Sequence, residues 1–189
     1  MSLEEFLRFE NAHPDRHEFV AGDVYAISGG TLRHSRIIQN ISFTLMSRAR
    51  GGPCEVHANI LKVQIGDDRI YYPDALVLCA QLPGDTLVLR EPCVIVEVTS
   101  PSSVRTDRGE KLAAYRRLTS LRAYLIVDQR RRRVDRHWRD VGDVWQHEEF
   151  LVEGSVPVPC IDTPLTLDEI YEGVDLPRVS EPEFVEYEA

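Results

Sequence analysis

The sequence predicts one α/β domain built on a mixed β-sheet, and three observations support this fold class. The run from Cys93 to Val98 is apolar and largely β-branched, which is typical of a strand buried on both faces near the centre of a sheet. A helical pattern and a second apolar run, Tyr124 to Val127, follow it in the order of a right-handed strand–helix–strand unit. The 189 residues suffice for one domain with a full core, and the chain shows no repeat or low-complexity linker.

The N-terminal part is predicted to contain a helix, a hairpin and a longer helix. Ser2 and Glu5 form a capping-box pattern, and the helix that follows should end before Pro14. Residues 16–27 have the pattern of a β-hairpin that turns at a glycine. Residues 31–48 carry apolar side chains at helical spacing, with a threonine in the N-cap position.

The middle of the chain is predicted to be a second hairpin followed by the central strand. Residues 54–65 and 70–79 are strand-like and flank a turn, so we expect them to pair with each other. An amphipathic helix should run from Asp107 to about Leu118, with Asp107 as its N-cap rather than as a metal ligand.

The C-terminal part is predicted to be an antiparallel extension, a short helix and a tail. Residues 130–138 and 144–151 should form the extension, and residues 166–171 the helix. We expect residues 1–174 to form the domain and residues 175–189, which are acidic and contain proline, to be a flexible tail.

Composition and charge limit the possible partners. The net charge of −9, from 22 basic and 31 acidic residues, argues against strong non-specific binding to nucleic acid but not against a local basic patch. No segment is apolar enough to cross a membrane, and the N-terminus lacks the pattern of a secretory signal. We therefore expect a cytoplasmic protein without a membrane partner, whose four cysteines are reduced and structural.

Three polar residues fall where a metal site could form. Asp74 precedes a strand, Glu97 lies inside the next one, and Lys111 is one turn into the following helix. An ionised carboxylate in a buried strand is costly without a cation, so Glu97 meets either a structural arginine or a metal ion. Carboxylates from adjacent strands suit Mg²⁺, and a lysine can stabilise developing charge. The alternatives are a strand-entry role for Asp74 and a solvated position for Lys111.

The lysines of the chain are unusually few. Apart from Lys62 and Lys111, every basic residue is an arginine, which a bias in codon use would also explain. Because arginine and lysine are not interchangeable, we regard these two positions as candidates for a chemical role.

Several segments resemble a known family. Pro73-Asp74 with the later Glu97-Val98-Thr99 resembles the motif of the PD-(D/E)XK nuclease superfamily. The segments HEFVAGDVYAISGGTLRHSRI, YYPDALVLC, VIVEVTSPSS and DRGEKLAAYRRL are similar to the Uma-type restriction endonuclease family, and the resemblance extends to about residue 173.

The resemblance implies a restriction-endonuclease-like core flanked by helices and hydrolysis of DNA phosphodiester bonds with Mg²⁺ or Mn²⁺. It further implies that Asp74, Glu97 and the backbone carbonyl of Val98 bind the metal ion. The motif lysine is replaced by Thr99, and Lys111 on the next helix would take its role, with Lys62 as the second choice. The alternative is an inactive nuclease fold that binds nucleic acid or a partner protein. For the enzyme we expect a homodimer, because two symmetric sites can cut both strands of a duplex.

Other residues are candidates of a second rank. The resemblance marks Glu18 as a further acidic ligand, although it also suits a surface strand. His34, in the first turn of its helix, either faces the cleft or is a surface residue. The basic run Arg130, Arg131, Arg132 and Arg133 either follows a phosphate backbone or forms a solvated turn.

Overall fold

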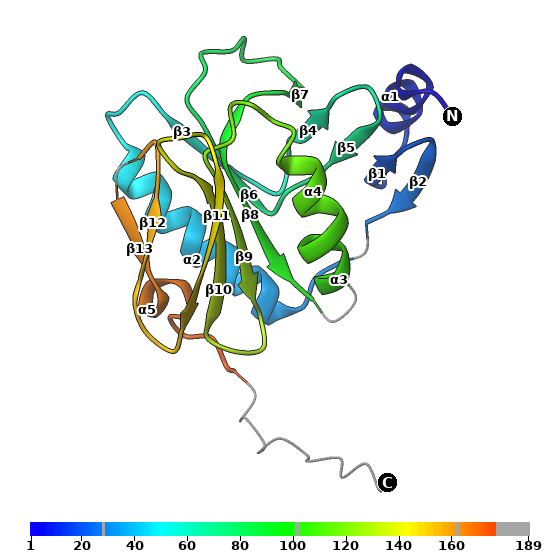
Figure 1. The fold of residues 1–189 in the computed structure, drawn as a ribbon. Coiled ribbons are helices and arrows are strands. Elements are labelled where there is room, and N and C mark those ends of the chain that lie inside the picture. The colour runs from blue at the N-terminus through cyan, green and yellow to red at the C-terminus, as the bar shows by residue number, and fades with distance from the viewer. Residues whose placement is uncertain (28, 101–102, 162, 177–189) are drawn as a thin grey trace, which may run out of the picture.

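The computed structural model describes residues 1–27, 29–100, 103–161 and 163–176, and it shows a mixed six-stranded sheet with helices on both faces (Figure 1). The strand order is β11-β10-β9-β8-β6-β3. The central strands β8 (Pro92–Thr99) and β9 (Ala123–Asp128) are parallel, and every other pair in this sheet is antiparallel. This arrangement confirms the mixed sheet and the predicted strand–helix–strand unit. The remaining strands are β3 (Glu55–Ala58), β6 (Ala75–Leu78), β10 (Arg133–Arg139) and β11 (Trp145–Leu151).

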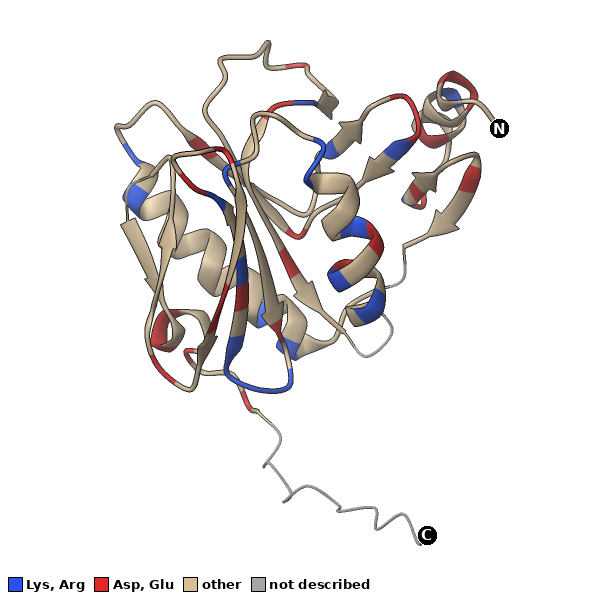
Figure 2. Ribbon diagram, viewed as in Figure 1, with Lys and Arg blue, Asp and Glu red and all other residues tan. Residues whose placement is uncertain are grey.

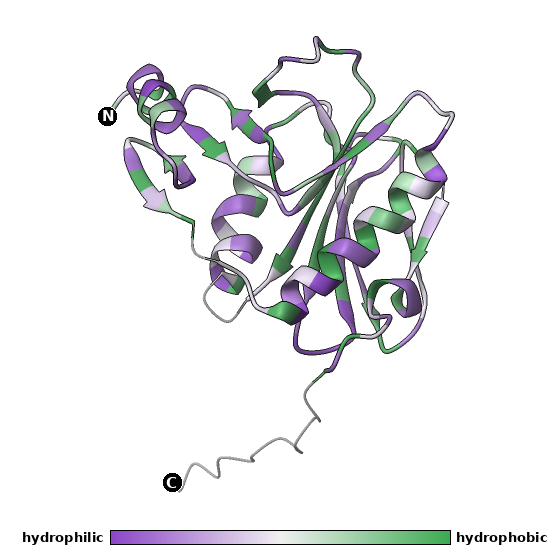
Figure 3. Ribbon diagram, turned by 180° about the vertical axis from the view of Figure 1, so that it is seen from behind, coloured by the Kyte–Doolittle hydropathy of each residue, from purple (hydrophilic) through white to green (hydrophobic). Residues whose placement is uncertain are grey.

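One face of this sheet packs against α2 (Leu32–Ala49). All eight residues of β8 are buried, as its continuous apolar run predicts. Alternate residues of β8, including Val94 and Val96, join the apolar side of α2 at Ile37 and Ile41 in one core cluster. Figure 3 shows α2 lying across this face of the sheet. The predicted N-cap of this helix, Thr31, is confirmed, since its side chain accepts a hydrogen bond from the backbone N–H of His34.

The opposite face is covered by a helical segment whose start differs from the prediction. It consists of α3 (Val104–Thr106), the π-helical turn η1 (Asp107–Lys111) and α4 (Leu112–Tyr115). Tyr115 and Leu118 pack with Ile95 and Tyr124 of the sheet in a second core cluster. The prediction that Asp107 is the N-cap is wrong, because the helix begins one turn earlier and buries this side chain.

A second sheet, of five strands in the order β2-β1-β5-β4-β7, lies beside the first. Its members are β1 (His17–Val20), β2 (Asp23–Ala26), β4 (Lys62–Ile65), β5 (Arg69–Tyr71) and β7 (Val88–Leu89). The first helix, α1 (Leu3–Ala12), begins at the predicted capping box and packs on this sheet through stacking of Phe6 on Phe19. The hairpin predicted over residues 16–27 is confirmed as β1 and β2.

The second predicted hairpin is correct in its pairing but not in its continuity. Its two arms pair as expected, β3 with β6 and β4 with β5, yet each arm breaks into two strands that belong to different sheets. The first arm breaks at Asn59, which has a positive φ of 55°, and the second breaks at Pro73, which has no N–H to donate. The break separates the sheets immediately before Asp74.

The C-terminal region contains one hairpin that the sequence did not reveal. The antiparallel extension is confirmed as β10 and β11. It is followed by the unpredicted pair β12 (Ser155–Val158) and β13 (Thr163–Thr166) and by the predicted helix α5 (Leu167–Ile170). The tail predicted from residue 175 lies outside the described residues from position 177 onward. Among the described residues, the helices are all too short or too polar to span a membrane.

The expectation of four reduced cysteines is wrong for this structure, in which Cys54 is bonded to Cys79 and Cys93 to Cys160. The bonded residues are 25 and 67 positions apart in the chain. Strand register places Cys54 beside Cys79, and the segment after β12 brings Cys160 to Cys93, so no short spacing motif is involved.

The structure makes His137 a predicted source of acid sensitivity. Burial, together with the nearby His147 and Arg116, lowers the pKa of His137 to about 4. As the pH falls below 6.5, the unfolded chain takes up a proton that the folded chain does not, so stability falls until about pH 4. The loss should reach at most about 3 kcal/mol. Denaturant unfolding at a series of pH values should show a shallower loss over this range for His137→Gln.

The exposed His13 offers the matched control for that measurement. His13→Gln should keep the acid dependence of the unaltered chain. If the curves for His137→Gln and the unaltered chain are parallel from pH 6.5 to 4, the interpretation is wrong.

Candidate active site

A cavity of about 530 Å³ lies where β8, the start of α2 and the N-terminal hairpin approach the η1 turn. Figure 2 shows an acidic position on β8 beside the charged turns of the α3–α4 segment. The polar lining of this cavity includes four carboxylates, a lysine and a histidine: Glu18, Asp74, Glu97, Asp107, Lys111 and His34. The cavity therefore brings together the three predicted site residues, Asp74, Glu97 and Lys111. It also contains the two second-rank candidates Glu18 and His34.

Asp74 is held in place by the backbone of the neighbouring strand. Its carboxylate Oδ2 accepts a hydrogen bond of 2.7 Å from the N–H of Val98 on β8. The same oxygen lies 3.3 Å from Nε2 of His34, which α2 presents from its first turn. Burial alone would lower the pKa of His34, but the hydrogen bond and charge of Asp74, with the backbone of Val98, outweigh it and raise this pKa. Asp74 thus stabilises the protonated form of His34 relative to the neutral form.

Glu97 is the buried carboxylate at the centre of the site, with only 4% of its surface exposed. Its Oε1 lies 3.1 Å from Nζ of Lys111 and accepts a 2.9 Å hydrogen bond from the hydroxyl of Tyr115. The first partner is thus a lysine, in place of the arginine that a purely structural ion pair was expected to use. Burial raises the pKa of Glu97, the charge of Lys111 opposes this rise, and the nearby Asp74, Asp107 and Glu18 add to it.

Lys111 joins three separate parts of the fold. Its Nζ lies 2.8 Å from Glu18 on β1, 3.1 Å from Glu97 on β8 and 3.8 Å from Asp107, four residues earlier in η1. Burial would lower the pKa of Lys111, but these three carboxylates reverse the direction and raise it. The amine is therefore fixed as an ammonium ion at neutral pH. π-Helical turns such as η1 are frequent at functional sites.

The charges around this ammonium favour a further cation. Among the described residues, Glu18, Asp74, Glu97 and Asp107 share one cavity with the ammonium of Lys111. Burial raises the pKa of Asp107 as well, and the nearby acidic groups add to that rise. Carboxylate oxygens in this number are the ligands that Mg²⁺ and similar hard cations prefer. The residues present thus fit a divalent metal ion, which would relieve the repulsion among them.

Two of the predicted residues lie elsewhere or face a different group. Lys62 is on β4, which pairs with β5, the strand that ends just before Asp74, but Lys62 is not part of the cavity lining. Its Nζ lies 3.4 Å from the side-chain oxygen of Asn11 and above the ring of Tyr72. Thr99, which stands in place of the motif lysine, is buried and donates to the carbonyl of Val127 at 3.4 Å.

The basic run contributes one residue to the cavity. Arg130 lines it, at the turn between β9 and β10. Its three successors make internal ion pairs: Arg131 with Asp128, Arg132 with Asp168, and Arg133 with Asp135 and Glu149. The interpretation as a solvated, paired turn therefore describes most of the run, and the interpretation as a phosphate track is restricted to Arg130.

The sequence interpretation missed the roles of Asp107 and Tyr115. Asp107 was assigned to a cap, although its spacing of four residues from Lys111 places both on one side of a helix. Tyr115 continues the same side one turn later and reaches Glu97. The pattern of an acid, a lysine and a tyrosine at intervals of four residues was the signal available in the sequence.

The comparisons with known proteins agree with this fold. The model of the Uma2 family, described as "Putative restriction endonuclease", matches residues 3–168. Two relatives come from Synechocystis sp. and bear the names uncharacterized protein slr1290 and uncharacterized protein sll1609. The first is 34% identical and covers 92% of this chain and 93% of its own length. The second is 28% identical and covers 82% and 90%.

A solved structure shares the architecture. The crystal structure of a "putative nuclease belonging to DUF820" from Anabaena variabilis superposes with a TM-score of 0.77 at 17% identity, over 93% of this chain and 99% of that one. At this identity the likeness shows the fold, which is the restriction-endonuclease-like mixed sheet that the resemblance implied. With the family model matched over most of its length, the chain belongs to the Uma2 family of restriction-endonuclease-like proteins.

Proposed function

We propose that this protein is a Mg²⁺-dependent nuclease that hydrolyses DNA phosphodiester bonds at the site of Asp74, Glu97 and Lys111. The observation that carries the proposal is the convergence of acidic side chains on one buried ammonium ion inside a cavity. A stable protein does not require such an excess of buried negative charge, whereas a metal-dependent hydrolase does.

The metal ligands in this proposal are Asp74, Glu97 and the carbonyl of Val98, with Glu18 as a further acidic ligand. A bound Mg²⁺ (or Mn²⁺) supplies polarisation of a phosphoryl oxygen and a lower pKa for a coordinated water. The N–H of Val98 orients Asp74, and the hydroxyl of Tyr115 orients Glu97, so both carboxylates are positioned before any ligand arrives.

Lys111 supplies the positive charge opposite the phosphate. The surrounding carboxylates keep it protonated, so it can donate a hydrogen bond to the negative charge that develops on phosphorus-bound oxygens. His34, whose pKa is raised by Asp74, lines the same cavity.

The replacement of the motif lysine by Thr99 does not remove the amine from the site. The side chain of Thr99 is engaged by the strand β9, and the following helix brings the amine of Lys111 within 3.1 Å of Glu97. This arrangement favours an active enzyme over the alternative of an inactive module that only binds nucleic acid or a protein.

The DNA contact is proposed to use the basic residues at the mouth of the cavity. Arg33 and Arg130 line it, in a chain whose net charge is −9. Binding should thus depend on a local patch and be sensitive to salt. For cleavage of both strands we propose a homodimer with two equivalent sites.

Glu97→Gln should remove metal-dependent cleavage while the chain stays folded. The amide keeps the shape of the side chain but loses the charge that holds the cation. Cleavage of plasmid DNA with Mg²⁺ should fall by at least about 100-fold, and calorimetry should show weaker Mg²⁺ binding.

The matched control is Asp135→Asn. Asp135 is another buried carboxylate of the six-stranded sheet, but its partners are Arg108, Arg133 and His147. This variant should retain cleavage per folded molecule. If Glu97→Gln cleaves DNA as well as the unaltered chain does, the assignment of Glu97 is refuted. If the unaltered chain binds Mg²⁺ but does not cleave DNA, the site has a non-catalytic role.

Lys111→Met should destabilise the metal-free protein by about 3–5 kcal/mol, because it leaves the buried carboxyl group of Glu97 without its cationic partner. The double variant Lys111→Met, Glu97→Gln should recover a large part of this loss. Denaturant unfolding in the presence of a chelator measures both effects, and additive losses would show that the two side chains are not coupled.

Arg130→Ala should weaken DNA binding and reduce the salt dependence of the affinity by about one phosphate contact. Arg131→Ala, which removes a neighbouring arginine that is paired with Asp128, should change neither. Binding titrations at several salt concentrations distinguish the variants. Equal effects of the two substitutions would mean that Arg130 has no specific place in the DNA contact.

A further inference from the structure

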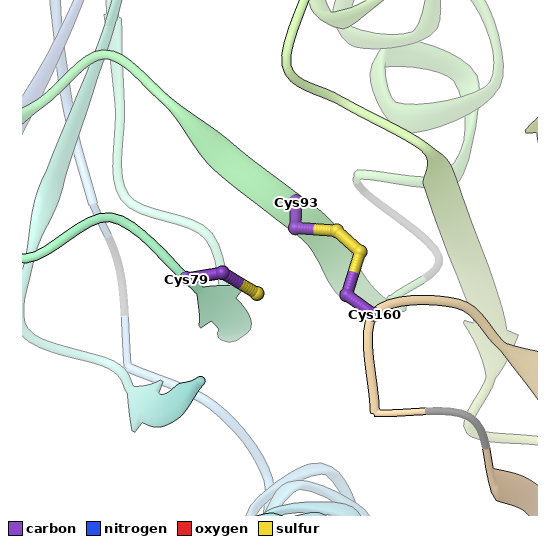
Figure 4. Close-up of side chains that lie close together, drawn as sticks. All are labelled: Cys79, Cys93 and Cys160. Carbon is purple, nitrogen blue, oxygen red and sulfur yellow. A yellow bond between two sulfur atoms is a disulfide. The ribbon is translucent and has the colours of Figure 1, made fainter. Parts of the chain in front are cut away.

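We propose that the four cysteines, once reduced, form a structural binding site for one zinc ion, distinct from the acidic cavity. The sulfur atoms of Cys79, Cys93 and Cys160 all lie within 4.8 Å of one another. Figure 4 shows Cys79 directed toward the bonded pair of Cys93 and Cys160.

The fourth cysteine belongs to the same cluster. Cys54 is bonded to the sulfur of Cys79, and its own sulfur lies 3.4 Å from the carbonyl oxygen of Cys160. Each cysteine thus touches a member of the other disulfide or its backbone. Two independent disulfides need only be close within each pair. In this structure the two disulfides also lie next to each other.

Strand register assembles the cluster at one end of the six-stranded sheet. β3 pairs with β6 so that Glu55 is opposite Leu78, which places Cys54 and Cys79 side by side one residue further on. Leu78 is also paired with Pro92, the neighbour of Cys93. Cys160 reaches the same point from between β12 and β13, in a left-handed conformation with φ of 73°.

The geometry fits a zinc ion bound by four thiolates. A tetrahedral site with Zn–S distances of about 2.3 Å places its sulfur atoms roughly 3.8 Å apart. The sulfur atoms of Cys79, Cys93 and Cys160 already lie within 4.8 Å of one another, and Cys54 is bonded to Cys79. Cys54 and Cys93 are buried, Cys79 is partly buried and Cys160 is exposed, so the ion would lie at the edge of the core with access from solvent. Zinc with four thiolates carries a net charge of −2, and Arg122 lines the same cavity of about 480 Å³.

The conversion from the bonded form is balanced. A dithiol reductant supplies two electrons and two protons to each disulfide, which yields four thiols. One zinc ion then replaces the four thiol protons, which are released to solvent. All four cysteine thiols of the chain are then bound to the zinc ion.

The two sites are separated along β8. Cys93 precedes Glu97 by four residues, which is about 13 Å along a strand. Zinc would therefore tie β3, β6, β8 and the β12–β13 connection together without entering the acidic cavity. Its ligands are soft sulfur atoms, whereas those of the acidic cavity are hard oxygens.

The test uses the full chain, reduced by a dithiol and dialysed against zinc without oxygen. Elemental analysis should give one zinc per chain, and zinc should protect the four thiols from alkylation. With cobalt(II) as the probe, the chain should show thiolate-to-metal charge-transfer absorption and the intense visible bands of tetrahedral coordination. Cys93→Ser and Cys160→Ser should each weaken cobalt binding by at least about 100-fold.

Ser120→Ala is the matched control, because Ser120 lines the same cavity but donates its hydroxyl to the carbonyl of Pro92. It should bind cobalt as the unaltered chain does. Failure of the reduced chain to bind zinc or cobalt, persistence of both disulfides under the reductant, or unchanged cobalt binding by Cys93→Ser would each overturn the proposal. Thiol protection is measured on the unaltered chain, so the result does not depend on the folding of any variant.

Discussion

The buried ion pair of Glu97 and Lys111 is the constraint on which the arrangement of the site depends. A carboxylate in the middle of a strand buried on both faces is costly unless a cation reaches it. The helix after β8 meets this requirement through the η1 turn, which directs Lys111 back to the strand. The same ammonium contacts Glu18 and thereby ties the N-terminal hairpin to the central sheet.

The break between the two sheets creates space for the site. Pro73 ends the run of backbone hydrogen bonds along the chain from β5 to β6, which belong to different sheets. Asp74 follows it at the border of the two sheets. From there its carboxylate reaches the backbone N–H of Val98 on the neighbouring strand. A continuous hairpin of the kind that the sequence predicts would have closed this border. The acidic cavity is therefore a consequence of the same local interruption that places its first ligand.

Charge is distributed differently at the two ends of β8. Toward the end of the strand, acidic groups surround a single ammonium in a cavity that also exposes Arg130. Near its start, the four cysteines line a second cavity, which Arg122 also lines. Much of the arginine content is used internally, as in the pairs of Arg132 and Arg133 with acidic side chains. An acidic protein can therefore present positive charge locally, where the proposed substrate would enter.

The sequence by itself determined the helices, the central strand and three of the residues that meet in the cavity, because these follow from local periodicity and from the cost of a charge in an apolar run. Only the tertiary structure decided the break in the hairpin, the burial of Asp107 and the absence of Lys62 from the lining of the acidic cavity. It also decided the convergence of the cysteines, which depends on contacts between segments up to 106 residues apart. Periodicity identifies which residues face inward, but it carries no information on which strands become neighbours.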